Sequence, residues 1–242
     1  MTGIRILMYH SISDSSEFFS VTSSEFEWQM RLLRQRNVES VFASQIPTVL
    51  KEGRSNIVCV TFDDGYEDMY SHAFPILQRY AIKATGFVIT DILGKSYHNS
   101  NGAEFPVLTE NQIQEMLASG LVEFMPHTQS HQNLDEVSLE AAIEEIEGSR
   151  KKIESLTGKT AAVFAYPRGR FTHSIVEHLR NNWSAAVTVE RGIATASDDL
   201  FLLPRIAIDA VTTRRAFRAA LDGSLGKYRL LKSLKAHTGI SL

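Results

Sequence analysis

Short apolar segments alternate with helix patterns along nearly the whole of this 242-residue chain, and this alternation constrains the fold more than any other feature. Ile57–Phe62 shows the strand type, since it is apolar and β-branched like strands that are buried on both faces. The sequence predicts strands at Ile4–Tyr9, Ile57–Phe62, Lys83–Thr90, Leu121–Met125, Ala161–Tyr166, Ala185–Val189 and Leu202–Ile208. It predicts helices between them, from Thr22 or Ser23 onward and at Tyr70–Tyr80, Thr109–Ser119, Ser138–Leu156, Ser174–Asn181 and Thr213–Leu221. Strands separated by helices pair in parallel, and about seven such units favour an α/β fold of one domain, a distorted (β/α) barrel.

Composition narrows the class of protein. Hydrophobic residues form 43% of the chain, enough for a sizeable core, and the net charge of −3 gives no basic excess for a nucleic-acid backbone. No apolar run is long enough to span a bilayer, and the first residues lack the apolar core of a secretory signal. The single cysteine, Cys59, fits a reducing compartment, so we expect a cytoplasmic protein, with a trimmed signal left open. We expect one domain over residues 1–242 with a basic tail from about residue 223, and the sequence carries no signal of oligomeric state.

Two adjacent carboxylates, Asp63 and Asp64, follow the apolar segment Ile57–Phe62. In a (β/α) barrel, the chemistry is carried out at the C-terminal ends of the strands. A turn at Gly65 allows both side chains to face one pocket, and two like charges held together there favour a bound cation. An Asp-Asp-Gly run is also an ordinary turn signal, so the pair alone leaves the metal-binding and the turn interpretation open.

His127 and His131 follow the predicted strand Leu121–Met125, again at a strand end. Their i, i+4 spacing places both imidazoles on one face if the segment is helical, as in many metal sites. Two surface histidines are the simpler interpretation of this pair taken alone. Two histidines with one aspartate leave a coordination position open, which is typical of a catalytic rather than a structural metal site.

Two more strand ends, and the interior of one further predicted strand, carry candidate residues. His10 closes the first predicted strand and can act as a general acid near neutral pH. Tyr166 stands before a Pro-Arg-Gly run, where an irregular loop can present backbone N–H groups to a ligand, or simply be a turn. Arg205 lies in an apolar segment, where its charge needs a partner. Asp209 and an active-site carboxylate are both candidates for that partner, and a surface-exposed Arg205 is the alternative.

Taken together, these motifs resemble a known family. Thr61–Tyr66, His127-x-x-x-His131 and the Tyr166-Pro167 loop, in this order, resemble the polysaccharide deacetylases, also called the NodB-homology group or carbohydrate esterase family four. The early run Tyr9-His10-Ser11-Ile12 resembles the subgroup in which the histidine motif comes first, to which poly-N-acetylglucosamine deacetylases belong. The resemblance covers most of the chain.

The resemblance implies a metal-dependent hydrolase that removes N-acetyl groups from a sugar in a polysaccharide or a glycan precursor. It implies a divalent transition metal, with zinc first and cobalt, nickel or iron as alternatives. By position, the implied metal ligands are Asp64, His127 and His131. Such a metal lowers the pKa of the water that it binds and polarises the substrate carbonyl. An amide needs this help, because it is a poor electrophile.

The resemblance also implies roles beside the metal. It makes Asp63 the general base, His10 the general acid and the backbone N–H of Tyr166 a donor to the oxyanion. Many members place an arginine before the proline of the third motif; this chain has none there, so Arg205 is the candidate to supply that charge. Arg168 stands where a tyrosine is frequent in the subgroup, and it is a candidate to recognise an anionic group on the substrate.

Two other functions are compatible with parts of this pattern. One is a catalytically silent carbohydrate-binding protein on the same fold. Against it, the three implied metal ligands, the implied base Asp63 and the implied acid His10 are all present. The other keeps the hydrolase but changes the bond, as in a deformylase or an O-deacetylase that acts on a lipid-linked or other glycan. A comparison of acetylated and formylated substrates separates the deformylase from the N-deacetylase.

Overall fold

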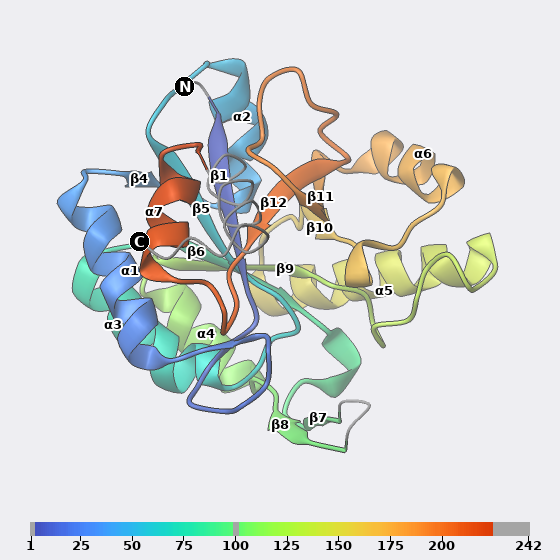
Figure 1. Ribbon diagram of the computed structural model, residues 1–242. Helices are drawn as coiled ribbons and strands as arrows, with labels where there is room; N and C mark the ends of the chain where they lie inside the picture. Colours follow the sequence, from blue (N-terminus) through green and yellow to red (C-terminus); the bar gives the residue numbers. More distant parts are fainter. Residues whose placement is uncertain (1–2, 99–101, 225–242) are drawn as a thin grey trace, which may run out of the picture.

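The computed structural model describes residues 3–98 and 102–224, and it contains the predicted parallel barrel (Figure 1). Seven parallel strands are hydrogen-bonded in the order β10-β11-β12-β1-β5-β6-β9. In chain order they are β1 (Ile4–Tyr9), β5 (Ile57–Phe62), β6 (Ala84–Val88), β9 (Val122–Pro126), β10 (Val163–Ala165), β11 (Ala185–Arg191) and β12 (Leu203–Ala207). The predicted fold class is therefore confirmed. Most of the predicted basic tail, residues 225–242, lies outside the described residues.

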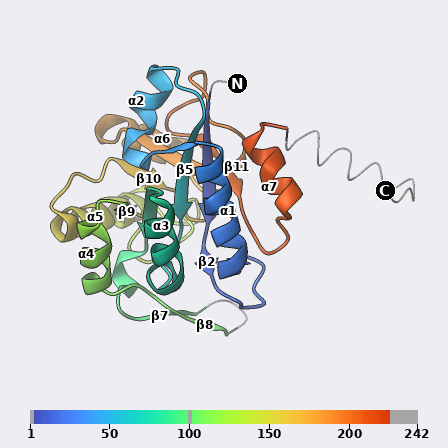
Figure 2. The same cartoon turned by 90° about the vertical axis from the view of Figure 1, so that its left-hand side faces the viewer.

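Helices surround the barrel on the outside (Figures 1 and 2). They are α1 (Ser23–Gln35), α2 (Ile46–Lys51), α3 (Phe74–Tyr80), α4 (Glu110–Ala118), α5 (Leu139–Thr157), α6 (His173–Asn182) and α7 (Arg214–Leu221). Several start at the residue type that the sequence pattern favours for a cap, since a side-chain oxygen accepts the orphan N–H of the first turn. Thr22, Thr109, Ser138 and Thr213 do so in α1, α4, α5 and α7, and each accepts from the N–H three residues later.

The core follows from strands that are covered on both sides. All six residues of β1 and all six of β5 are buried, as expected for parallel strands between a barrel interior and a layer of helices. The barrel is nearly closed: among the described residues, no backbone ladder joins β9 to β10. One side chain spans this seam, because His127 Nδ1, just after β9, donates to the carbonyl oxygen of Ala165 in β10 at 2.7 Å.

The predicted helix Tyr70–Tyr80 is divided in the structure. A π-helix, Met69–Ala73, precedes α3, and its last bond runs from the Phe74 N–H to the Met69 carbonyl five residues back. Pro75 supplies the reason, because it has no N–H and its ring clashes with the carbonyl four residues earlier in a regular α-helix. The wider turn avoids that clash.

Some short elements were not predicted. They are α2, the short helices Ala43–Gln45, Thr90–Ile92 and Pro167–Gly169, strand β4 (Glu39–Ser40) beside β5, the parallel pair β2 (Ser11–Ile12) and β3 (Ser20–Val21), and the hairpin β7 (Ser96–His98) with β8 (Glu104–Pro106). They are too short for a hydrophobic period to reveal them. Of the helices described, none is both long enough and apolar enough to cross a membrane.

Candidate active site

The candidate residues gather at the C-terminal ends of neighbouring strands. Tyr9 and Phe62 are partners in the register of β1 and β5, and the N–H of Asp63 continues the ladder by donating to the Tyr9 carbonyl at 2.9 Å. His10 and Asp63 therefore leave two adjacent strands at the same level. His10 is half-buried, whereas the Asp63 side chain is nearly fully buried.

Asp64, His127 and His131 form a compact group of three metal-ligand side chains. Nε2 of His127 lies 3.6 Å from Asp64 Oδ1, and Nε2 of His131 lies 3.4 Å from the same oxygen. The ligand atoms of all three lie within 4.8 Å of one another, and the three side chains are buried. Both imidazole–carboxylate distances are longer than an ordinary hydrogen bond. They match the roughly 3.3–3.6 Å that separates ligands held at about 2.0–2.2 Å around a tetrahedral ion.

The histidine pair is not on a helix, so the helical interpretation of its spacing is wrong. Residues 127–134 form a loop in which Thr128 and His131 have φ of 67° and 64°. These left-handed residues bring the two rings to a centroid distance of 5.0 Å. Glu145 of α5 stabilises the loop by accepting from the N–H groups of Gln129 and Ser130 at 2.9 and 2.8 Å. Backbone strain of this kind is concentrated at functional sites.

The protonation of both histidines suits metal binding. Because Nδ1 of His127 donates to a carbonyl, Nε2 keeps its lone pair for the site. Burial lowers the pKa of His127, and burial lowers the pKa of His131 to about 4. Neutral imidazoles are the form that coordinates a metal. Asp64 contributes an oxygen from a left-handed residue, with φ of 70°, at the turn that Gly65 completes.

Asp63 turns away from this group to a buried arginine. Nη1 and Nη2 of Arg205 donate to its two carboxylate oxygens at 2.7 and 2.6 Å, and Arg205 has no exposed surface. Nε of Arg205 donates to the Thr188 carbonyl at 2.8 Å. Burial alone would raise the pKa of Asp63, but the charge and hydrogen bonds of Arg205 outweigh it and bring the pKa to about 2. Asp63 is therefore a fixed, ionised carboxylate, and both the Asp209 partner and a surface-exposed Arg205 are wrong.

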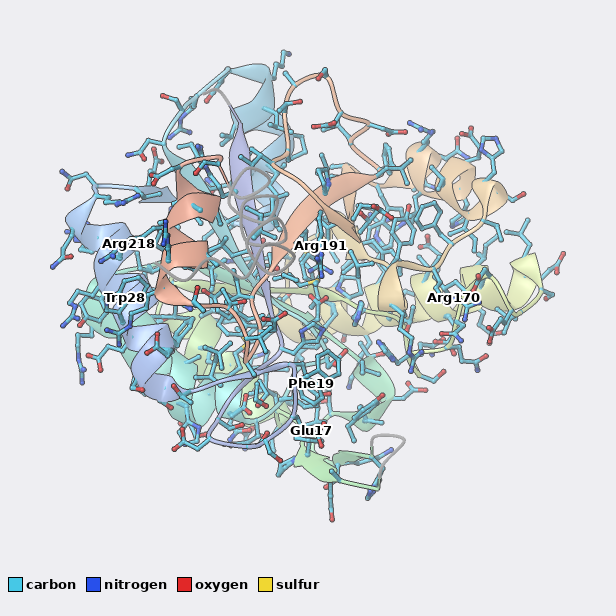
Figure 3. The ribbon with its side chains drawn as sticks, viewed as in Figure 1. Glu17, Phe19, Trp28, Arg170, Arg191 and Arg218 are labelled. Carbon is cyan, nitrogen blue, oxygen red and sulfur yellow. The ribbon has the colours of Figure 1, made fainter. Side chains whose placement is uncertain are left out.

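An aromatic rim borders these residues. Phe19 stacks on Tyr66 with ring centroids 5.7 Å apart, and both rings contact Phe105 of β8. Tyr97 of β7 meets the His131 ring edge-on at 6.2 Å. Figure 3 shows Phe19 on the side of the molecule that carries the β7–β8 hairpin. The hairpin thus walls the site, and Tyr97 and Phe105, one in each of its strands, are the aromatic residues in the sequence that could have indicated this.

Known proteins resemble this chain in sequence and in fold. The sequence model of a family described as polysaccharide deacetylase matches residues 51–183, more than half of the chain. The chain belongs to the polysaccharide deacetylase family. YxkH of Bacillus subtilis strain 168, whose name places it among the polysaccharide deacetylases, is 29% identical over 221 residues, covering 90% of this chain and 75% of YxkH. A Staphylococcus aureus protein named poly-beta-1,6-N-acetyl-D-glucosamine N-deacetylase is 27% identical over 214 residues, covering 84% of this chain and 72% of that protein.

The solved structures agree with the sequence relatives. The Streptococcus pyogenes deacetylase PplD, solved in complex with acetate, superposes with a TM-score of 0.78 and 28% identity, over 92% of this chain and 98% of PplD. The chain is accordingly a carbohydrate deacetylase, which is a hydrolase. The sequence resemblance to this family is confirmed, and so is its barrel fold.

In this deacetylase, the hydroxyl and the backbone N–H of Tyr166 both have hydrogen-bond partners within the protein. The Tyr166 hydroxyl donates to the Phe201 carbonyl at 3.1 Å, and its N–H donates to the Val187 carbonyl at 3.3 Å. The N–H thus has a partner within the barrel, and an oxyanion would have to compete for it. The oxyanion role of Tyr166 stays a prediction.

Two arginines of the same loop tie it to the histidine loop. Arg168, itself left-handed with φ of 54°, donates to the carbonyl of His131 and to Asn133 Oδ1 at 3.0 and 2.8 Å. Arg170, labelled in Figure 3, pairs with Asp135 at 3.0 Å. Arg168 is thus partly engaged by the protein itself, and its recognition of an anionic substrate group stays a prediction.

Proposed function

We propose that this protein is a metal-dependent deacetylase that removes the N-acetyl group of an N-acetylated sugar in a polysaccharide or a glycan precursor. The observation that carries the proposal is the arrangement at one end of the barrel: a group of three metal-ligand side chains, with an ionised Asp63 and His10 on adjacent strand ends beside it. The Staphylococcus aureus relative is named as an N-deacetylase of poly-N-acetylglucosamine, and PplD was solved with acetate, the second product of such a reaction.

Asp64, His127 and His131 would hold the ion. Their one oxygen and two nitrogen donors suit zinc first and also cobalt, nickel or iron. When bound, such an ion supplies Lewis acidity, which makes water more acidic and an amide carbonyl more electrophilic. Three protein ligands leave room for a further ligand, the pattern of a catalytic site.

The remaining residues divide the proton transfers. Asp63 accepts the proton of the attacking water at a carboxylate oxygen, since each oxygen keeps a lone pair beyond its bond to Arg205. His10 donates a proton to the amide nitrogen as the carbon–nitrogen bond breaks, because an unprotonated amine leaves poorly. Water and the N-acetyl sugar thereby become acetate and the free amine. Arg205 is a positioning residue that keeps Asp63 ionised and oriented.

Metal binding is tested most directly with the purified protein. We expect about one divalent transition metal per chain by mass spectrometry. Asp64→Ala should lose that metal, because it removes the carboxylate oxygen that lies nearest to Nε2 of both histidines. Asp91→Ala is the matched control, because Asp91 is an exposed aspartate. Absence of metal after incubation with zinc, cobalt or nickel would contradict the proposal and favour a silent carbohydrate-binding protein.

The acid role of His10 predicts a dependence on the leaving group. His10→Ala should keep the metal and release acetate from N-acetylglucosamine oligomers roughly 10²–10⁴ times more slowly. The same variant should hydrolyse para-nitrophenyl acetate nearly as fast as the parent protein, because that leaving group departs without a proton. His173→Ala, at an exposed histidine of α6, is the control. An equal loss on both substrates would show that His10 does not act as the acid.

A further inference from the structure

The backbone that follows His10 has little support of its own. Strand β2, Ser11–Ile12, pairs only with the equally short β3 and lies outside the barrel sheet. A two-stranded unit of this size is not stable alone. Both residues of β2 are nonetheless fully buried, so other contacts must fix them.

Those contacts come from the π-helix Met69–Ala73 and the residue before it. Ser11 Oγ donates to Asp68 Oδ2 at 2.6 Å, and the Ile12 N–H also faces the Asp68 carboxylate. Nδ1 of His72 donates to the Ile12 carbonyl at 2.7 Å, since a carbonyl can only accept. Asp68 and His72 thus hold both the donor and the acceptor groups of β2 from one turn of helix. None of these residues belongs to the candidate metal group.

Asp68 precedes the π-helix and His72 lies within it, four residues later. Helical residues four positions apart lie on one face, so both side chains reach the same strand. π-turns are frequent at functional sites. Asp68 also has a buried Oδ1 without a hydrogen-bond partner, which is unfavourable for a carboxylate and rare in folded proteins. Retention of such a group is expected where it serves a role beyond packing.

We propose that Asp68 and His72 are positioning residues for His10, holding the backbone just after it so that its imidazole is kept in place to donate a proton. The proposal rests on the proposed function of His10. On its other side, His10 follows Tyr9, whose carbonyl is fixed by the Asp63 N–H. The general acid is therefore held between two anchors, one shared with the general base and one supplied by the π-helix. A displacement of about 1 Å in such a group can cost roughly 10²-fold in rate.

We call the contacts of Asp68 and His72 with β2 the tether. The test compares two variants of each of these residues with a control variant on the same helix. Asp68→Ala and His72→Ala remove the contacts, whereas Asp68→Asn retains an acceptor for Ser11 and His72→Asn retains a donor for Ile12. Ser71→Ala is the control, because Ser71 lies in the same π-helix but bonds to Glu67. The readouts are kcat and KM for acetate release from soluble N-acetylglucosamine oligomers, metal content, and the backbone NMR order parameter of His10.

We expect Asp68→Ala and His72→Ala to lower kcat by about 10-fold or more, with KM and metal content unchanged. The order parameter of His10 should fall from about 0.85 to below about 0.6, while the Asn variants and Ser71→Ala should resemble the parent protein. In a His10→Ala background, Asp68→Ala should cause no further loss of kcat, because the group it positions is absent. If Asp68→Ala does not fold, Ser11→Ala removes the same hydrogen bond with a smaller change.

Two results would overturn the proposal. An unchanged His10 order parameter in both Ala variants would show that the tether does not hold His10. A further 10-fold loss from Asp68→Ala in the His10→Ala background would show that Asp68 acts elsewhere. Failure of the proposed function has a different signature: the order parameter falls as expected, but neither His10→Ala nor Asp68→Ala changes kcat. That result would uphold the tether and remove His10 from the mechanism.

Discussion

Asp63→Asn is expected to keep the metal and to slow acetate release by roughly 10²–10⁴-fold. Asparagine has the size of aspartate and can still accept one hydrogen bond from Arg205, but its amide cannot take a proton from water. The metal ligands Asp64, His127 and His131 do not contact Arg205 in this arrangement, so metal content should not change.

The measurement pairs turnover with metal content on the same sample. Asp91→Asn is the control for replacing a carboxylate by an amide at an exposed position. Comparison of Asp63→Asn with Asp64→Ala separates the roles of these two adjacent residues. Asp63→Asn should lose turnover but keep the metal, whereas Asp64→Ala should lose both. Full activity of Asp63→Asn would remove Asp63 as the base and with it the proposed division of proton transfers.

If Asp63 is the base, as we propose, its low pKa limits its strength. A carboxylate with a pKa of about 2 is fully ionised at any working pH but holds a proton only weakly. The ion pair with Arg205 thus makes Asp63 a weaker base, but it keeps the carboxylate charged and in a fixed orientation.

Much of the fold could be predicted because the barrel strands are short runs buried on both faces. Ile4–Tyr9 and Ile57–Phe62 have the predicted bounds, since apolar β-branched runs have few other solutions. α5 follows Ser138 as predicted, and the left-handed Gly158 caps its C-terminal end, because cap chemistry is local. The helix over residues 70–80 was predicted as continuous, and only the effect of Pro75 on the preceding turn explains its division.

The site shows where reasoning from sequence ends. That Asp64 and the two histidines meet follows from their place at strand ends, but the left-handed Thr128 and His131 that bring them together do not follow from their side chains. Local geometry in such loops depends on tertiary contacts such as the bonds of Glu145 to the loop. The partner of Arg205 was open for the same reason: Asp209 is close in sequence, whereas Asp63 is 142 residues away and follows β5, two strands along the sheet from β12.

The second large effect concerns stability. Arg205→Met should lower the free energy of unfolding by about 3–5 kcal/mol, because it leaves the buried Asp63 carboxylate without a counter-charge. Urea unfolding of the parent protein and the variant measures this difference. Arg214→Met is the matched control, since Arg214 makes a similar forked contact with Glu25 at the surface, where water replaces the lost partner. Arg214→Met should lower the free energy of unfolding by much less than Arg205→Met.

A double variant tests whether the stranded charge is the cause. Asp63→Asn combined with Arg205→Met should be more stable than Arg205→Met alone, because the carboxylate that lost its partner is then neutral. If the stability lost in Arg205→Met came only from its packing near Phe87, the second change would restore nothing. Recovery in the double variant, together with its lack of turnover, would show that one buried ion pair serves both purposes: it stabilises the barrel interior, and it keeps Asp63 charged and oriented for the reaction.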